Sequence, residues 1–215
     1  EGIRAFLDKE IYKPFAATTQ TRDDLLRYAG SCAKATRSYS PEIADELEGM
    51  AEGTGLRLEE IVLSTLHEEL YHRGVLPPIE HCTAIAAGPP STADGNTYVG
   101  QTWDWMTSVY GLSSMLHWKR PDGPSVLAYS YPGLWVGAGL NSSGIALTWT
   151  SAALGKGQTD IAEPRVGISS YILIAQILYQ DSLDAAIEEA RRATQAGWFT
   201  FVLADACATG LPPDR

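Results

Sequence analysis

The stretch CTAIAAGPPSTADGNTYVGQTWDW, from Cys82 to Trp105, decides our interpretation of the fold. Two β-rich runs, 83–87 and 97–102, flank a connection rich in turn-forming residues, a pattern that favours an antiparallel hairpin. If the chain folds back at about position 93, Ile85 lies near Gln101 and Cys82 lies near Asp104. The pattern therefore predicts a cysteine and a carboxylate at the same end of a sheet.

Helical patterns precede this hairpin. We expect one helix over about 21–37, and a second that is capped by Ser40, begins at Pro41 and ends near Gly53 and Gly55. A third is expected over about 58–72, because apolar side chains recur on one side of it. In that helix we expect four acidic side chains to face solvent: Glu59, Glu60, Glu68 and Glu69.

Short strands and then two helices follow the hairpin. We expect strands over 114–118, 125–131, 134–140, 145–150 and 198–204, and helices over about 168–180 and from Asp181 or Ser182 to about Ala190. A block of antiparallel strands followed by a helix pair predicts a sheet with helices on one face. The fold class is therefore α+β. The spacing of apolar residues changes from helical to β-like near Cys82, which marks a boundary between 1–81 and 82–215.

Composition narrows the range of partners. The 215 residues carry a formal net charge of −10, and 45% of them are hydrophobic, so we expect a globular protein that binds neither nucleic acid nor membranes. The three cysteines, at 32, 82 and 207, have no zinc-site or redox spacing, which favours a reducing, cytoplasmic location. His67 and His72 are five residues apart and do not share a helical face, so we expect no metal and no cofactor.

Cys82 and Asp104 together suggest nucleophilic chemistry. A carboxylate beside a new N-terminus could hold its ammonium group, or orient the neutral amine to take the thiol proton. An α-amino group titrates at about 8 and a thiol at about 8.5, so the two are matched near neutral pH. The alternative is that Cys82 is a small buried apolar residue and Asp104 is a turn carboxylate.

The segment from Cys82 to Trp105 resembles the start of the catalytic chain of the isopenicillin-N acyltransferase family, which are cysteine N-terminal nucleophile hydrolases. The resemblance extends to the helical stretches 41–53 and 59–62 and to the hairpin Gly139-Leu140-Asn141-Ser142-Ser143-Gly144. It implies that 1–81 is a helical pro-segment and that 82–215 is the first part of a four-layer αββα sandwich. The late asparagine and arginine of the family have no match after Phe201, so we expect the sandwich to be incomplete at its C-terminus.

The same resemblance implies an activity and its residues. The chain would cut itself between His81 and Cys82, and Cys82 would then carry the acyl group as a thioester. Asp104 would hold the Cys82 amine, and Gln101 would fix the acyl carbonyl or Asp104. Thr83, Trp103 and Trp105 would contact the substrate, which we expect to be a small acylated amine, an amino-acid amide or an acyl thioester.

A second interpretation is an incomplete or non-catalytic relative that serves as a binding or assembly module. The missing late asparagine and arginine favour it. A sheet with an uncovered face would also be expected to associate with a second copy of the chain.

Overall fold

The computed structural model describes residues 2–72, 82–133, 135–151 and 165–206. Helices come first: α1 (Gly2–Phe6), the π-helical turn η1 (Leu7–Tyr12), α2 (Lys13–Phe15), α3 (Arg22–Tyr39), α4 (Pro41–Thr54), α5 (Leu58–Thr65) and α6 (His67–His72). Strands and two further helices follow: β1 (Thr83–Ala87), β2 (Tyr98–Thr102), the 3-10 turn η2 (Thr107–Val109), β3 (Ser114–Trp118), β4 (Val126–Ser130), β5 (Gly139–Asn141), β6 (Ile145–Ser151), α7 (Ser170–Leu178), α8 (Leu183–Arg192) and β7 (Phe199–Asp205). This mixed, antiparallel arrangement agrees with the expected α+β class.

Local capping chemistry explains the start and end of α4. The Ser40 hydroxyl accepts the backbone N–H of Ile43, and Pro41 occupies the first helical turn, where its missing N–H costs nothing. Gly55 ends the helix in the left-handed conformation at φ 65°, which a side chain would strain. The predicted bounds of this helix are therefore confirmed, except that the chain stays helical through Gly53.

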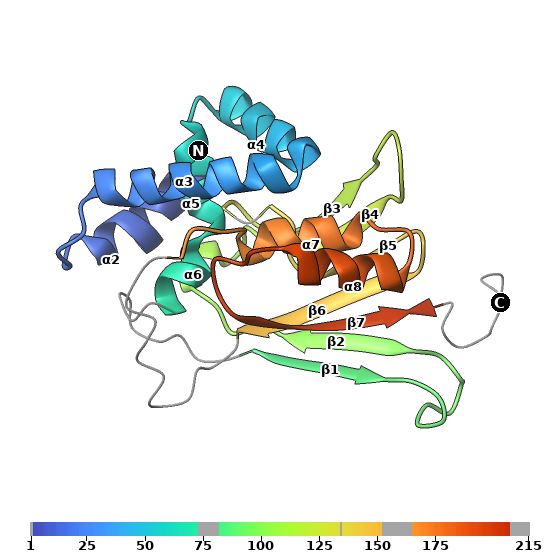
Figure 1. The fold of residues 1–215 in the computed structure, drawn as a ribbon. Coiled ribbons are helices and arrows are strands. Elements are labelled where there is room, and N and C mark those ends of the chain that lie inside the picture. Colours follow the sequence, from blue (N-terminus) through green and yellow to red (C-terminus); the bar gives the residue numbers. More distant parts are fainter. Residues whose placement is uncertain (1, 73–81, 134, 152–164, 207–215) are drawn as a thin grey trace.

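Two sheets form the β part of the molecule. Strands β3, β4, β5, β6 and β7 form one antiparallel sheet in chain order, and β1 and β2 form a separate hairpin. The hairpin contacts β6 and β7, while α7 contacts β5 and β6 and α8 contacts β7. Figure 1 shows α7 and α8 above β6 and β7 and the hairpin below them. The order of layers is thus helices, five-stranded sheet, hairpin.

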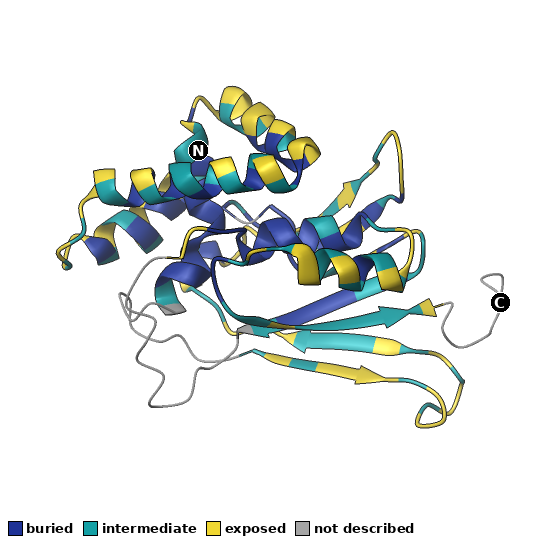
Figure 2. Ribbon diagram, in the orientation of Figure 1, coloured by how far each residue is buried: buried dark blue, intermediate teal, exposed yellow. Residues whose placement is uncertain are grey.

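One hydrophobic core joins the two halves of the chain. Every residue from Ile61 to Leu70 is buried, and the apolar side chains of this stretch belong to the same cluster as Trp149 of β6 and Tyr171 of α7. The outer face of the hairpin is exposed by contrast, with Ile85 65% and Tyr98 55% accessible (Figure 2). The core therefore lies between the helices and the five-stranded sheet.

The predicted helix over 58–72 is wrong in one respect, because the structure divides it at Leu66. Side chains compete there for backbone carbonyl groups: the Ser64 hydroxyl donates to Ile61 O, the Thr65 hydroxyl to Val62 O, and His67 Nδ1 to Ser64 O. Such local bonds offer the backbone an alternative to the helical ladder. The chain then resumes as α6 in a new direction (Figure 1).

Three of the four acidic residues expected in solvent are buried. Glu60 accepts the backbone N–H of Arg57 and pairs with the Arg22 guanidinium at 2.7 Å. Glu68 and Glu69 lie on α6 and are 6% and 1% exposed. Glu69 Oε1 accepts the N–H of Ser170 at 2.6 Å, and so binds the first turn of α7, where a carboxylate is favoured.

The predicted strand over 134–140 is shorter in the structure, where β5 begins at Gly139. Gly137 N–H donates to Tyr129 O, and Tyr129 N–H donates to Ala138 O, so two residues oppose one as in a β-bulge. Trp135 precedes the bulge and is buried, with its ring edge-on to Trp118 and Tyr179. The stretch before β5 is therefore held by this ring and by the bulge, and a regular ladder begins only at Gly139.

Candidate active site

The hairpin register determines which side chains meet at its open end. Thr83 pairs with Thr102 and Ala84 with Gln101, so Cys82 lies opposite Trp103 when the register is continued by one residue. Directly opposed residues in a sheet share a face. Cys82, Gln101 and Trp103 therefore belong to the inner face of the hairpin, toward β6 and β7.

The register predicted from the sequence was wrong by one residue. The turn closes through the bond from Ser91 N–H to Gly88 O and the weaker bond from Gly95 N–H to Thr92 O, which centres the hairpin between positions 92 and 93. A slip of one residue exchanges the two faces of a strand. It brings Gln101, in place of Thr102, to the side of Cys82.

Gln101 is held rigidly beside the thiol. Its Oε1 accepts the backbone N–H of Trp149 at 3.0 Å, at a point on β6 beyond the last residue that pairs with β5. Its Nε2 is buried and, among the described residues, acts only on the Cys82 thiol, whose pKa it lowers. The amide therefore has a fixed orientation and a donor available for a thiolate or an acyl oxygen.

The thiol of Cys82 is half-buried, and its pKa is raised above the ordinary value. Burial is the largest cause, followed by the charge of Glu68, and the Asp104 carboxylate adds a smaller increase. The backbone N–H of Asp104 and the side chain of Gln101 oppose them and lower the pKa. The thiol is therefore protonated at neutral pH, and a nearby cation would be needed to favour the thiolate.

Asp104 lies in the irregular segment after β2, and its side chain is exposed. Both its backbone N–H and its carboxylate act on the Cys82 thiol, so the two predicted residues are brought together although they do not face one another in the hairpin. This arrangement leaves the carboxylate at the solvent side of the thiol, where it could hold a cation.

A buried polar cluster, which the sequence did not reveal, lies on the inner side. We define it as His67 and Glu68 of α6, Tyr131, and Tyr171 of α7. His67 Nε2 lies 3.4 Å from the Tyr131 hydroxyl and 3.3 Å from the Tyr171 hydroxyl, and the Tyr171 hydroxyl donates to Glu68 Oε1 at 3.3 Å. Burial lowers the pKa of His67 to about 4 and raises that of Glu68 to about 8.

Trp103 and Trp105, predicted to contact substrate, connect the thiol to this cluster. The Trp103 ring stacks on Tyr171 at 6.5 Å and lies edge-on to Trp149 at 5.4 Å. The Trp105 ring lies 5.1 Å from His67. Both indoles are half-buried and pack against the core, and the Trp103 indole N–H lacks a hydrogen-bond partner among the described residues.

Two other predicted site residues are not brought into this group. Thr83 is exposed on the outer face of the hairpin, opposite Thr102, whose hydroxyl accepts its backbone N–H at 3.1 Å. His81, the predicted residue before the cut, lies outside the described residues.

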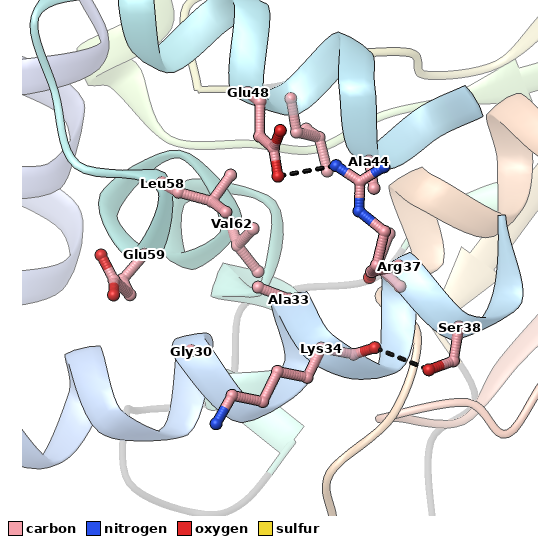
Figure 3. Close-up of a pocket in the computed structure, with 12 residues that line it drawn as sticks. Gly30, Ala33, Lys34, Arg37, Ser38, Ala44, Glu48, Leu58, Glu59 and Val62 are labelled. Carbon is pink, nitrogen blue, oxygen red and sulfur yellow. Dashed lines mark hydrogen bonds and ion pairs between the residues drawn. The ribbon is translucent and has the colours of Figure 1, made fainter. Parts of the chain in front are cut away.

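A separate cavity of about 460 Å³ lies between α3, α4 and α5. Ala33, Ala44 and Leu47 contribute to its apolar lining, and an ion pair of 2.6 Å joins Arg37 to Glu48 beside it (Figure 3). No residue of the hairpin lines this cavity, so it does not belong to the Cys82 site. Over the stretches described, no group of three or more His, Cys, Asp or Glu could hold a metal ion, and no helix is long and apolar enough to cross a membrane.

Comparison with known proteins gives one relationship to report. No family model matches the chain. The chain is 23% identical over 137 residues to the 40 kDa form of the acyl-coenzyme A:6-aminopenicillanic-acid-acyltransferase of Emericella nidulans. The aligned region covers 64% of this chain and 37% of that protein. The chain thus spans well under half the length of this relative. The match indicates a weak, distant homology to an acyltransferase.

Proposed function

We propose that this chain is a self-processing cysteine N-terminal nucleophile hydrolase. It would cut the bond between His81 and Cys82, and then act as an acyltransferase or amidohydrolase through a thioester on Cys82. The substrate would be a small acylated amine, an amino-acid amide or an acyl thioester. The observation that carries the proposal is the Cys82 thiol at the open end of the hairpin, between the fixed Gln101 amide and the Asp104 carboxylate.

The raised pKa of the thiol in the uncut chain fits this sequence of events. Cleavage would create an α-ammonium group on Cys82 itself, and a cation so close favours the thiolate. Its neutral form, with a pKa of about 8, would take the thiol proton as Sγ attacks the acyl carbon. When the acyl–nitrogen bond of the substrate breaks, the same ammonium would return the proton to the leaving amine, and water or a second amine would then release the acyl group.

Gln101 and Asp104 would have different roles in this cycle. Asp104, at the solvent side of the thiol, would hold the ammonium. The free Nε2–H of Gln101 would donate to the oxyanion that forms on the acyl group, while the Trp149 N–H keeps the amide from rotating. Trp103 and Trp105 would form an apolar wall for the acyl group.

The layer order gives further support. We propose a four-layer αββα sandwich as the complete fold, in which the helices, the five-stranded sheet and the hairpin would be three of the layers. A fourth layer would cover the exposed outer face of the hairpin, where Ile85 and Tyr98 are accessible.

Acylation by p-nitrophenyl acetate tests the function. We expect one acetyl group on Cys82, located by peptide mass mapping, and none after Cys82→Ala. Cys32→Ala is the matched control, because Cys32 is a buried thiol of α3 and its loss should leave the adduct intact. Absence of the adduct on a cleaved wild-type chain would contradict the enzymatic proposal.

A second candidate function is a non-catalytic binding or assembly module. The exposed apolar side chains of Ile85 and Tyr98 favour it, because they leave a sheet face available for a partner. This candidate predicts no adduct on Cys82 with any activated ester.

A further inference from the structure

The cavity between α3, α4 and α5 has no part in the function proposed above. Its lining comes from three helices within residues 30–62, so it is separate from the hairpin that carries Cys82. A volume of about 460 Å³ lies within the range of small-molecule sites, whereas ordinary packing leaves few spaces larger than a water molecule. The space therefore needs an explanation of its own.

Small side chains keep this cavity open. Gly30 and Ala33 of α3 and Ala44 of α4 line it at positions where larger residues would fill the space between the helices. The apolar part of the lining is aliphatic: Ala33, Ala44, Leu47, Leu58 and Val62 (Figure 3). The walls are therefore suited to an alkyl chain.

The lining residues of α3 run along one side of that helix. Gly30, Ala33, Lys34 and Arg37 recur at i, i+3, i+4 and i+7, the spacing of a single helical face. At about 1.5 Å for each residue, this face extends for about 10 Å. An extended alkyl chain of medium length matches such a wall better than a compact ring does.

Four charged side chains line the cavity, and ion pairs engage three of them. Arg37 pairs with Glu48 at 2.6 Å (Figure 3). Glu59 pairs with Arg57 at 3.3 Å. Lys34 is exposed, and no carboxylate lies within ion-pair distance of it in the part of the chain that the structure describes. Among the four, Lys34 thus supplies a positive charge that no described carboxylate balances.

We propose that this cavity binds a medium-chain carboxylate, with its alkyl chain along the aliphatic walls and its carboxylate at the Lys34 ammonium group. Burial of the chain supplies the affinity, because each CH₂ group leaves water. The ammonium group selects an acid over a neutral chain of the same length. This site goes beyond the proposed function and does not depend on cleavage before Cys82.

Equilibrium dialysis against labelled ligands tests the proposal. The probes are octanoate, 1-octanol, which has the same chain without the charge, and acetate, which has the charge without the chain. We expect the wild-type chain to bind octanoate, to bind 1-octanol roughly 10-fold more weakly, and to retain no acetate.

Two variants separate the head group from the chain. Lys34→Gln should weaken octanoate binding roughly 10-fold and leave 1-octanol binding unchanged, because only the charge is lost. Arg27→Gln is the matched control, since it removes an exposed cation of the same helix outside the cavity. Ala33→Phe should weaken both ligands alike, by roughly 10-fold or more, because the ring takes the space of two or more CH₂ groups.

Each result decides the proposal. Octanoate that binds Lys34→Gln as tightly as wild type would refute the place of the head group, and octanoate that binds a folded Ala33→Phe chain normally would put the ligand elsewhere. Because Lys34 is exposed, its variant keeps the fold and decides the outcome even if Ala33→Phe does not fold. A wild-type chain that retains no octanoate at millimolar concentration would overturn the site itself. The proposed function is tested separately, because none of these results bears on cleavage before Cys82.

Discussion

Asn141 offers the sharpest test of the packing that supports the site. The residue is 2% exposed and lies at the end of β5. Its Nδ2 donates to Leu178 O at 2.9 Å and to Gln180 O at 2.8 Å, and its Oδ1 accepts the N–H groups of Ser143 and Ile145 at 3.0 Å. A single side chain thus ties the C-terminal end of α7 to the β5–β6 hairpin, which carries Trp149.

Replacing Asn141 with Ala removes all four bonds and leaves buried backbone groups without partners. At about 1 kcal/mol for each bond, we expect a loss of about 4 kcal/mol in the free energy of unfolding. Urea unfolding followed by tryptophan fluorescence measures it as a shift of the midpoint with an unchanged slope.

Ser142→Ala is the matched control in the same turn. Within the described part of the chain, the Ser142 hydroxyl accepts one N–H, that of Ser125, at an exposed position, so its loss should cost less than about 1 kcal/mol. A loss below about 1 kcal/mol for Asn141→Ala would refute the claim that this amide joins the helix layer to the sheet.

Three other predictions concern the site directly. Gln101→Met removes the acceptor of the Trp149 N–H and the free donor together, so the rate of Cys82 acylation by p-nitrophenyl acetate should fall roughly 100-fold; an unchanged rate would contradict the role of the amide. The free energy of unfolding should depend on pH through two buried groups. Burial lowers the pKa of His67 from 6.5 to about 4, so stability is lost as the pH falls from 6.5 to 4. The pKa of Glu68 is raised from 4.5 to about 8, so stability is lost as the pH rises from 4.5 to 8. Unfolding free energies should therefore decline by about 1.4 kcal/mol per pH unit between 6.5 and 8, and Glu68→Gln should abolish that decline; equal slopes would disprove it. Finally, residues 61–70 are all buried, so the two chains of a cleaved protein should elute together from a sizing column in native buffer and apart in urea, and separate native peaks would be the contrary result.

Much of the fold could be predicted from the sequence because short-range rules decide it. Ser40, Pro41 and Gly55 fix the ends of α4 through capping and the left-handed conformation. Alternating β-rich runs with turn residues between them gave the bounds of β1 and β3 as the structure has them. These features depend on neighbours within a few residues, which a single sequence contains.

Tertiary packing decided the features that the sequence could not predict. Glu59 and Glu68 look alike in the sequence, yet Glu68 lies on α6, after the break at Leu66, and is buried against Tyr171, while Glu59 is half-exposed. The register of the β1–β2 hairpin differs by one residue from the prediction, because it depends on the hydrogen bonds within the long connection between the two strands. The role of Asn141 could not be predicted either, because its bonds to Leu178 and Gln180 join segments almost forty residues apart.

For the candidate site, the hairpin pattern predicted Cys82 beside Asp104, and only the resemblance added Gln101; the structure has all three at the same end of the hairpin. The buried polar cluster of His67, Glu68, Tyr131 and Tyr171 was missed. Its members come from three separate segments, and only the fold assembles them.

The central claim is that Cys82 becomes an N-terminal nucleophile by cutting the bond before it. Intact mass under denaturing conditions, with wild type beside Cys82→Ala, tests this most directly. We predict two wild-type chains whose masses place the cut between His81 and Cys82, and one uncut chain for Cys82→Ala. A wild-type protein that stays whole, with a Cys82 thiol that resists alkylation in native buffer, would contradict the account.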